Sequence, residues 1–315
     1  MALPNDPIML LSMINLKLRD FYPTLDALCE DLDEDKAALC ARLSAVGYAY
    51  DPQRNQFVRQ QEDAAMIQGT YYKEWSRMLG RDMEFKVYGH AGTPVLALPA
   101  RGGRFYDWEN NGMPDAIAPL LNEGKVQLFC ADSIDAESLL AGDTAPRRRA
   151  EMQEKYFNYL TSELAPRILT LNGAKKDTLL WAVGVDTGAY QAVNCRLRRP
   201  EVFAGAIGLS GLYDVRRFLG NAADDLVLRN APLAYLAEEG LVDKKLLAKA
   251  EENALLLCAG QGSYEGDALA DTQAMADALT GCGLPVHLEV WGSDVSHDWY
   301  WWGKELNLFA ARVFG

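Results

Sequence analysis

The 315-residue sequence lacks any apolar run of the roughly 18 residues that a helix needs to cross a lipid bilayer. Its N-terminus also lacks the basic segment and the apolar segment that together mark an export signal. These absences predict a protein that neither spans a membrane nor is exported. We therefore expect a cytoplasmic protein, bacterial in character.

Histidine is scarce, with three residues, and none of the six cysteines forms a C-x-x-C pair. A zinc site needs clustered cysteine and histidine ligands. The sequence therefore predicts no metal site, and no motif implies an organic cofactor. Cys130 and Cys258 lie within apolar runs typical of strands. We expect buried free thiols, as in proteins of the reducing cytoplasm.

Positive charge is also in deficit, because 31 lysine and arginine residues face 44 aspartate and glutamate residues and leave a net charge of −13. Nucleic acids and anionic membrane surfaces both require basic patches on the proteins that bind them. The composition therefore argues against nucleic acid and membrane as partners. The excess of negative charge itself is typical of a soluble surface.

The sequence pattern of residues 1–60 predicts a small helical unit similar to a winged helix. Asp6 can cap a first helix, Thr24 can cap a second, and Gly47 can end a third. The segment 48–57 then predicts a short hairpin that would form the wing. Acidic residues outnumber basic ones in this unit by nine to six, which argues against DNA binding.

We expect residues 1–60 to form an interaction module that contacts a protein partner or a second copy of the chain. The opening LPNDP at residues 3–7 and the closing NQF at residues 55–57 resemble a small bacterial domain family of unknown function. This resemblance indicates a domain boundary and implies no activity.

Residues 61–70 predict a polar linker, and residues 71–315 predict the second domain. There, strand-like and helical segments alternate, which implies an α/β fold with a mostly parallel central sheet covered by helices. The expected strands cover residues 83–88, 95–98, 126–132, 178–183, 203–209, 255–259 and 286–291. The expected helices cover residues 147–171, 189–198, 269–281 and 299–313.

One short segment between a predicted strand and a predicted helix carries the most informative motif: Gly184-Val185-Asp186-Thr187-Gly188. Its spacing is that of a nucleophile elbow, G-x-S-x-G, with aspartate where the attacking serine would stand. Gly184 and Gly188 permit the sharp turn and a close approach of strand and helix. The N-terminus of the following helix favours a negative charge at Asp186.

Ligands bind at the carboxyl ends of the strands in such sheets. In the loop after residues 95–98, Arg101 or Gly102 can supply one backbone N–H of an oxyanion hole, and Thr187 can supply the other. The alternative interpretation of this loop is a glycine turn beside an aromatic packing cluster.

Two later loops can supply the remaining catalytic groups. After residues 255–259, Glu265 is the first candidate for the acid and Asp267 the second, and the alternative is that both are surface charges. His297 follows the last expected strand, which gives the order nucleophile, acid, histidine. His90, in an early turn, and His287, within a strand pattern, fit this role less well.

Residues 70–315 resemble the family named Putative esterase, of the esterase D type in the α/β-hydrolase superfamily, which also includes mycolyltransferases. The matching segments are residues 99–106, 131–138, 199–203, 209–214 and 297–302. The resemblance implies an α/β-hydrolase fold and a serine, an acid and a histidine that hydrolyse or transfer acyl groups. It also implies a small-molecule acyl ester or a related ligand. Asp186 departs from the pattern of the family.

Asp186 leaves several functions open. A carboxylate attacks esters poorly, because the anhydride that forms readily reverts. The first hypothesis is therefore a pseudo-esterase, in which Asp186 pairs with His297 and the pocket binds a ligand. The second is an active hydrolase, in which Asp186 attacks a saturated carbon, or in which water, Ser210 or Thr187 sustains ester or acyl-transfer chemistry. The third is protein interaction through residues 1–60.

Overall fold

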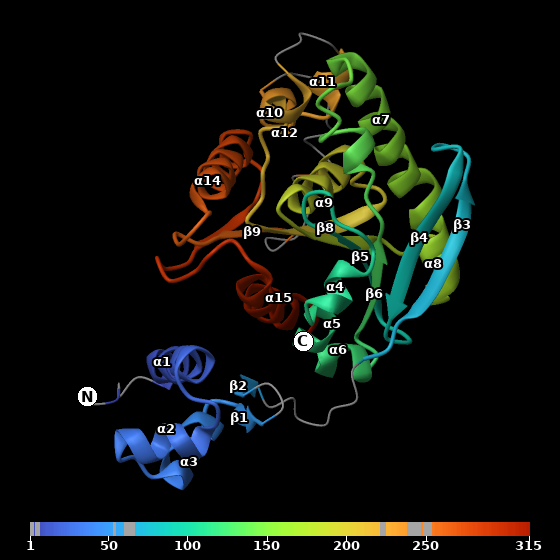
Figure 1. Cartoon of the computed structure of the whole chain (residues 1–315). Coiled ribbons are helices and arrows are strands. Elements are labelled where there is room, and N and C mark those ends of the chain that lie inside the picture. The colour runs from blue at the N-terminus through green and yellow to red at the C-terminus, as the bar shows by residue number, and fades with distance from the viewer. Residues whose placement is uncertain are drawn as a thin grey trace. The chain divides into compact units, whose positions relative to one another are not determined.

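The computed structural model describes residues 3, 7–52, 55–59, 67–220, 225–237, 247 and 254–315. The chain forms two compact units, Met1–Met66 and Ile67–Gly315, which Figure 1 shows. The predicted cap Asp6 and residues 61–66 of the predicted linker lie outside the described residues. Among the helices that are described, none is long and apolar enough to cross a bilayer.

The first unit contains helices followed by an antiparallel hairpin, in the order that the sequence predicts. The elements are α1 (Pro7–Asp20), α2 (Leu25–Leu32), α3 (Lys36–Ser44), β1 (Tyr48–Asp51) and β2 (Gln56–Arg59).

Side-chain caps determine where these helices begin. Thr24 Oγ1 accepts a hydrogen bond from the backbone N–H of Ala27 at 3.2 Å, as predicted. The carboxylate of Asp35 accepts one from Ala38 at 2.8 Å and caps α3. Gly47, with a φ of 83°, then lets the chain turn from α3 into β1.

The hairpin is joined to α1 by one side-chain amide and by apolar packing. Asn15 accepts a hydrogen bond from the Phe57 N–H at 2.7 Å and donates one to the Phe57 carbonyl at 2.9 Å. The side chains of Phe57, Leu10, Ile14 and Leu43 are all buried in one cluster. The first unit therefore has a hydrophobic core of its own.

The second unit is built on a sheet with the strand order β10-β9-β8-β7-β5-β6-β4-β3 among the described residues. All pairings from β10 to β6 are parallel, whereas β4 and β3 join antiparallel at one edge. The strands are β3 (Thr70–Ser76), β4 (Arg81–Tyr88), β5 (Thr93–Leu98), β6 (Val126–Ala131), β7 (Leu180–Val185), β8 (Phe203–Leu209), β9 (Leu255–Ala259) and β10 (His287–Val290).

Helices cover both faces of this sheet. They are α4 (Asp107–Asn110), α5 (Met113–Ala116), α6 (Ala118–Asn122), α7 (Pro146–Asn158), α8 (Ala165–Asn172), α9 (Thr187–Arg198), α10 (Arg216–Leu219), α11 (Asp225–Arg229), α12 (Pro232–Tyr235), α14 (Gly266–Gly281) and α15 (Trp299–Phe314). One apolar core lies between the sheet and α7, α8, α9 and α14. The other lies between the sheet and α4, α5, α6 and α15 (Figure 1). The predicted α/β class and the mostly parallel sheet are confirmed.

Two differences from the predicted elements have a clear physical reason. The helix expected over residues 147–171 is divided, because a π-helical segment, η2 (Tyr159–Leu164), separates α7 from α8. Strand β3 was not predicted. It is an edge strand that pairs with β4 alone, and Tyr71 and Trp75 on it are 49% and 65% exposed. It therefore lacks the apolar run that identifies the central strands.

We propose that the two units fold independently, and a fragment of residues 67–315 tests this. Each unit buries its own apolar cores. We expect the fragment to unfold cooperatively within about 4 °C of the main transition of the full chain, the shift that about 1 kcal/mol produces in a domain of this size. Differential scanning calorimetry measures both transitions. A fragment that aggregates or melts without cooperativity contradicts independent folding.

Candidate active site

The sharp turn between β7 and α9 presents Asp186 at the carboxyl end of the central strands. Asp186 has φ 55° and ψ −121°, a strained conformation that costs of order 1–3 kcal/mol in a residue other than glycine. Its N–H donates to the carbonyl of Leu209 in β8 at 3.0 Å. Its side chain is only 8% exposed. The neighbouring strand therefore holds Asp186 in the turn geometry that the motif predicts.

Two glycines make this turn sterically possible. A Cβ atom on Gly188 would lie 2.3 Å from the Pro99 carbonyl oxygen and 2.5 Å from that of Leu98. A Cβ atom on Gly184 would lie 2.1 Å from the carbonyl carbon of Gly188. The start of α9 thus packs directly on the ends of β5 and β7, and no methyl group fits between them.

His297 lies between two carboxylates at this end of the sheet. Its Nε2 atom is 3.6 Å from Oδ2 of Asp186, and its Nδ1 atom is 3.6 Å from Oε2 of Glu265. The Trp302 ring packs edge-on against the imidazole, with the ring centroids 4.9 Å apart. The structure thus brings Asp186, Glu265 and His297 together in the predicted order.

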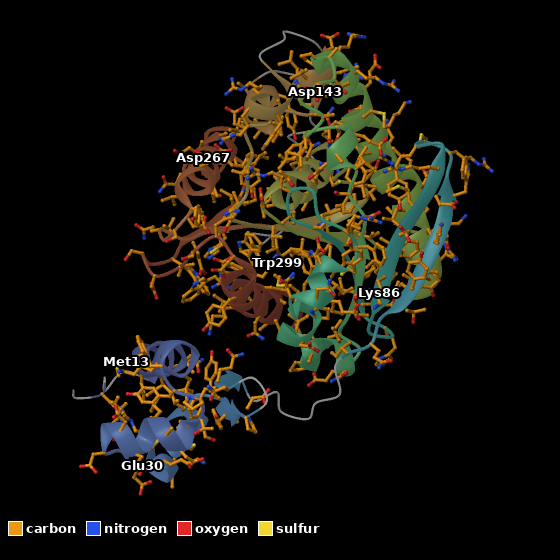
Figure 2. All side chains as sticks on the ribbon, viewed as in Figure 1. Met13, Glu30, Lys86, Asp143, Asp267 and Trp299 are labelled. Atoms are coloured by element: carbon orange, nitrogen blue, oxygen red, sulfur yellow. The ribbon has the colours of Figure 1, made fainter. Side chains whose placement is uncertain are left out.

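Glu265 and Asp267, the two candidate acids, lie in different environments. Glu265 is 1% exposed and is the acid that faces His297. The side chain of Asp267 is 82% exposed and pairs with Arg217 at 3.1 Å. Figure 2 shows Asp267 at the start of α14. Glu265, the first candidate for the acid, is therefore the one that faces His297.

The two hydroxyl groups considered as substitute nucleophiles are both engaged. Ser210 is fully buried, and its Oγ atom donates to Glu265 at 2.6 Å while accepting from the Trp302 indole N–H at 2.9 Å. Thr187 Oγ1 donates to the carboxylate of Asp135 at 3.1 Å. Neither hydroxyl hydrogen points to His297.

The two carboxylates keep His297 positively charged. Burial lowers the pKa of His297, but the facing carboxylates of Asp186 and Glu265 outweigh burial and raise this pKa to about 9. The side chain is therefore an imidazolium at neutral pH. Both ring nitrogens of an imidazolium are donors, so neither can accept a proton.

A second cation approaches the other oxygen of Asp186. The Arg101 Nη2 atom lies 3.4 Å from Oδ1 of Asp186, and the guanidinium group lies over the ring of Phe218, 5.6 Å from its centroid. Arg101 was predicted to act through its backbone N–H. The structure shows that its side chain reaches the site as well.

The backbone N–H of Gly102 is already occupied by Asp135. It donates to Oδ2 of Asp135 at 3.0 Å, and Thr187 Oγ1 donates to the same oxygen. Burial raises the pKa of Asp135 to about 6, an increase that these two hydrogen bonds reduce. Asp135 follows β6, which pairs in parallel with β5. The loop after β6 and the loop after β5 therefore meet at the carboxyl ends of these strands. Asp135 belongs to a segment that resembles the family, but only the strand order reveals its position.

A cavity of about 400 Å³ opens beside these charged groups. Tyr264 at its rim is 91% exposed and has a φ of 65°. The lining residues are Arg101, Leu212, Tyr264, Gly266, Asp267, Ala268 and His297. The cavity is therefore charged on the side of Arg101 and His297, and it gives a small molecule access to both.

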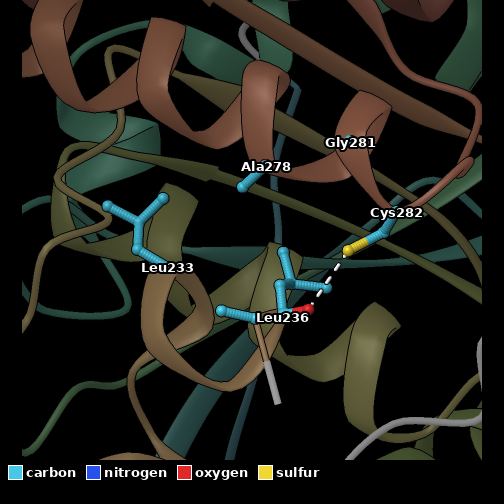
Figure 3. Close-up of a pocket in the computed structure, with 6 residues that line it drawn as sticks. Leu233, Leu236, Ala278, Gly281 and Cys282 are labelled. Atoms are coloured by element: carbon cyan, nitrogen blue, oxygen red, sulfur yellow. Dashed lines mark hydrogen bonds between the residues drawn. The ribbon is translucent and has the colours of Figure 1, made fainter. Parts of the chain in front are cut away.

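A second cavity, of about 510 Å³, lies between α12 and α14. Its lining residues are Leu233, Leu236, Ala237, Ala278, Gly281 and Cys282. The Cys282 thiol donates to the Leu236 carbonyl at 3.1 Å (Figure 3). The lining residues include no aspartate, glutamate, histidine, lysine or arginine.

The remaining histidines lie outside this cluster. His287, on β10, contacts Glu289 at 2.8 Å and Arg312 at 2.6 Å, and His90 is exposed in the turn after β4. In the described part of the chain, no group of three or more histidine, cysteine, aspartate or glutamate residues is arranged to hold a metal ion.

The chain matches two known families. Residues 76–312 match the family described as Putative esterase, and residues 4–57 match one described as Domain of unknown function (DUF4250). The comparison with curated proteins gave no match.

Several solved structures resemble the second unit. A ferulic acid esterase has a TM-score of 0.61 and 15% identity over 79% of this chain and 100% of its own. S-formylglutathione hydrolase of Staphylococcus aureus has a TM-score of 0.57 and 15% identity over 79% and 97%. MPT51 of Mycobacterium tuberculosis has a TM-score of 0.59 and 16% identity over 79% and 98%. The second unit therefore has the α/β-hydrolase fold.

The close packing at Gly188 predicts a large effect of a single methyl group. Gly188→Ala should destabilise the chain by about 1–3 kcal/mol or more, because the added Cβ collides with two backbone carbonyls. The matched control is Gly281→Ala at the end of α14, where nothing lies within 4 Å of the added atom. Urea unfolding measures both variants. Equal midpoints for the two would contradict the packing argument.

The charge on His297 predicts a pH dependence of stability. The pKa of His297 is about 9 in the folded chain, against 6.5 for an unperturbed histidine. The folded state therefore holds the proton more tightly, and this stabilisation is complete below about pH 6.5 and lost as the pH rises through 9. We expect a loss of up to about 3 kcal/mol over that range.

Urea unfolding between pH 6 and 9.5 measures this effect, with His297→Gln as the control. The variant should lack the part of the slope that His297 contributes. Parallel stability curves for the two proteins would show that the protonation of His297 is not linked to folding.

Proposed function

Because the chain belongs to the Putative esterase family, we propose that it is an esterase-like α/β-hydrolase homologue in which Asp186 stands where the family carries its nucleophilic serine. In this proposal ester hydrolysis is lost or strongly altered, and the pocket binds a ligand. The observation that carries the proposal is the position of the Asp186 carboxylate between two cations, His297 and Arg101.

Two physical reasons support the loss of ordinary ester chemistry. A serine esterase needs a neutral histidine that accepts the proton of the nucleophile, whereas the pKa of about 9 keeps His297 protonated at neutral pH. A carboxylate that attacks an ester carbonyl forms an anhydride, which readily reverts to the reactants. The Asp186–His297 pair therefore favours a static ion pair over a proton-transfer pair.

The ligand that we propose is a small acyl ester or a related acyl compound. The cavity of about 400 Å³ beside His297 suits a molecule of this size. Its wall combines apolar groups, such as Leu212, with charged groups that can orient a polar ligand. The structural neighbours named as a ferulic acid esterase and an S-formylglutathione hydrolase are consistent with an acyl ligand.

Nucleophilic attack by Asp186 on a saturated carbon is the principal alternative. Such an attack needs a carboxylate oxygen that is free to approach the carbon. Here Oδ1 faces Arg101 at 3.4 Å and Oδ2 faces His297 at 3.6 Å. Both contacts lower the electron density available for attack. Residual ester chemistry through Ser210 or Thr187 is disfavoured because both hydroxyls are engaged.

We further propose that residues 1–60 contact a protein partner or a second copy of the chain, and that the protein works in the cytoplasm of a bacterium. Phe21, which is 72% exposed, offers an apolar contact on the first unit. All six cysteines are free thiols, which is common where the environment is reducing.

Substitution of Asp186 tests the proposal directly. We expect Asp186→Ser to hydrolyse short-chain p-nitrophenyl esters at pH 8 at least 100-fold faster than the native chain. The serine restores a nucleophile, and removal of the carboxylate lowers the pKa of His297 toward a value at which it can accept a proton. The visible absorbance of the released p-nitrophenolate follows the reaction.

Two controls make the result specific. Asp186→Asn removes the negative charge without supplying a hydroxyl and should be inactive, and His297→Ala should abolish the activity of the serine variant. Ester hydrolysis by the native chain that depends on His297 would overturn the proposal. A covalent alkyl adduct on Asp186 after incubation with an alkyl halide, detected by mass spectrometry, would favour the alternative.

A further inference from the structure

The carboxylate of Asp135 binds a backbone N–H that is assigned to an oxyanion pocket, that of Gly102. Asp135 is 2% exposed and belongs to the short helix η1 (Asp135–Glu137) after β6. Its Oδ2 atom accepts hydrogen bonds from the Gly102 N–H at 3.0 Å and from Thr187 Oγ1 at 3.1 Å. The Gly102 N–H is a donor assigned to that pocket, so this internal carboxylate takes one donor that would otherwise serve a ligand. Its bond from Thr187 comes from the side-chain hydroxyl and not from the backbone N–H assigned to the pocket.

Hydrogen bonds fix the segment that carries Asp135. The Asp135 carbonyl accepts from the N–H of Leu140 at 2.7 Å and from that of Ser138 at 3.2 Å. Ser133 Oγ donates to the Gly103 carbonyl at 2.7 Å and ties this segment to the loop after β5. The carboxylate of Asp135 is therefore placed by its backbone and is not a freely swinging side chain.

The charged and titratable groups around Asp135 come from several elements. Asp186, in the turn before α9, repels its negative charge, and Arg101, in the loop after β5, attracts it. Tyr156 of α7 also interacts with Asp135, and burial raises the pKa of this tyrosine far above neutrality, so it stays uncharged. Burial is the largest influence on Asp135 itself and brings its pKa to about 6.

We infer that Asp135 determines which ligands enter the oxyanion pocket. While ionised, its carboxylate holds the Gly102 N–H and repels any anionic oxygen, so the pocket accepts neutral acyl compounds and rejects carboxylates. When Asp135 is protonated, the repulsion ends and its hydroxyl becomes a hydrogen-bond donor to an incoming oxyanion. This inference rests on the proposed function, because that function places a ligand in the cavity lined by Arg101, the chain neighbour of the Gly102 whose N–H binds Asp135.

Asp135 acts on ligand selectivity and takes no part in making or breaking a covalent bond. The neighbouring acid Asp132 provides a contrast on the same segment. Its Oδ1 atom pairs with Nε of Arg104 at 2.6 Å, and Arg104 also binds Glu84 at 2.9 Å. Asp132 therefore has a strong cationic partner of its own, whereas the two hydrogen bonds to the Asp135 carboxylate come from uncharged donors.

Binding of trifluoroacetate, followed by ¹⁹F NMR at constant ionic strength, tests the inference. This carboxylate stays ionised at both pH 5 and pH 8, and His297, with a pKa of about 9, stays protonated over the same range. At pH 8 we expect Asp135→Asn to bind trifluoroacetate at least 10-fold more tightly than the native chain. The native affinity should rise at least 10-fold from pH 8 to pH 5, while that of the variant should change less than threefold.

The control variant is Asp132→Asn, which removes the same charge from the same segment and should bind like the native chain. The neutral analogue trifluoroacetamide should bind the native chain equally at both pH values. Equal trifluoroacetate affinities for the native chain and Asp135→Asn at pH 8, or a native affinity that does not change with pH, would overturn the inference. Between pH 7 and pH 5 Glu305, whose pKa burial raises to about 8, stays protonated. Over that range the pH arm therefore reports on Asp135 in the native chain, even where a variant fails to fold.

These binding measurements involve no ester turnover. Because an ionised Asp135 also opposes an oxyanion intermediate, the ester test includes Asp186→Ser combined with Asp135→Asn. Failure of both the single and the double variant to hydrolyse esters would count against the proposed function and leave the anion-binding result unchanged. Loss of the predicted anion selectivity, with esters hydrolysed by Asp186→Ser, would count against the role of Asp135 alone.

Discussion

The site depends on the direct contact between the backbone of Gly188 and the carbonyl ends of β5. Because Gly188 has no side chain, α9 begins in contact with the central strands. Asp186, the residue before α9, is therefore held in a strained turn at the carboxyl ends of these strands. The residue at position 186 therefore lies at the carboxyl end of the central strands, beside two residues that line the cavity, Arg101 and His297. A helix N-terminus at this point favours negative charge. A serine in this turn would carry that charge only during reaction, whereas the Asp186 carboxylate lies between the cations His297 and Arg101.

The carboxylate of Asp186 changes the protonation of its neighbour His297. Asp186 and Glu265 are anions on either side of His297, and the three side chains form an alternating row of charge. Behind the row, Glu305 of α15 is fully buried, and burial raises its pKa to about 8, so this acid is neutral and does not add to the repulsion. Removing one partner of such a buried pair typically costs about 3–5 kcal/mol. The two carboxylates therefore hold the histidine as an imidazolium at neutral pH.

The sequence was most informative where side chains are buried in regular structure. The apolar runs at residues 203–209 and 255–259 coincide with β8 and β9, because central parallel strands are apolar on both faces. The motif at residues 184–188 and the chain order also identified Asp186, Glu265 and His297 as neighbours. The role of Asp135 was not predictable, since it depends on β6 lying beside β5. The side chain of Arg101 was missed for a related reason: a loop sequence does not reveal the direction of a long side chain.

The distances within the charged row favour binding over attack. Strong hydrogen bonds between charged groups are about 2.7–2.9 Å long, whereas Asp186 is 3.4 Å from Arg101 and 3.6 Å from His297. These contacts neutralise the carboxylate but leave its hydrogen-bonding capacity unsaturated. A neutral polar ligand in the adjoining cavity can therefore donate to Asp186 or accept from Arg101 and His297 without breaking a short hydrogen bond. In the proposed function, the two cations that flank Asp186 therefore serve to hold such a ligand at this end of the sheet.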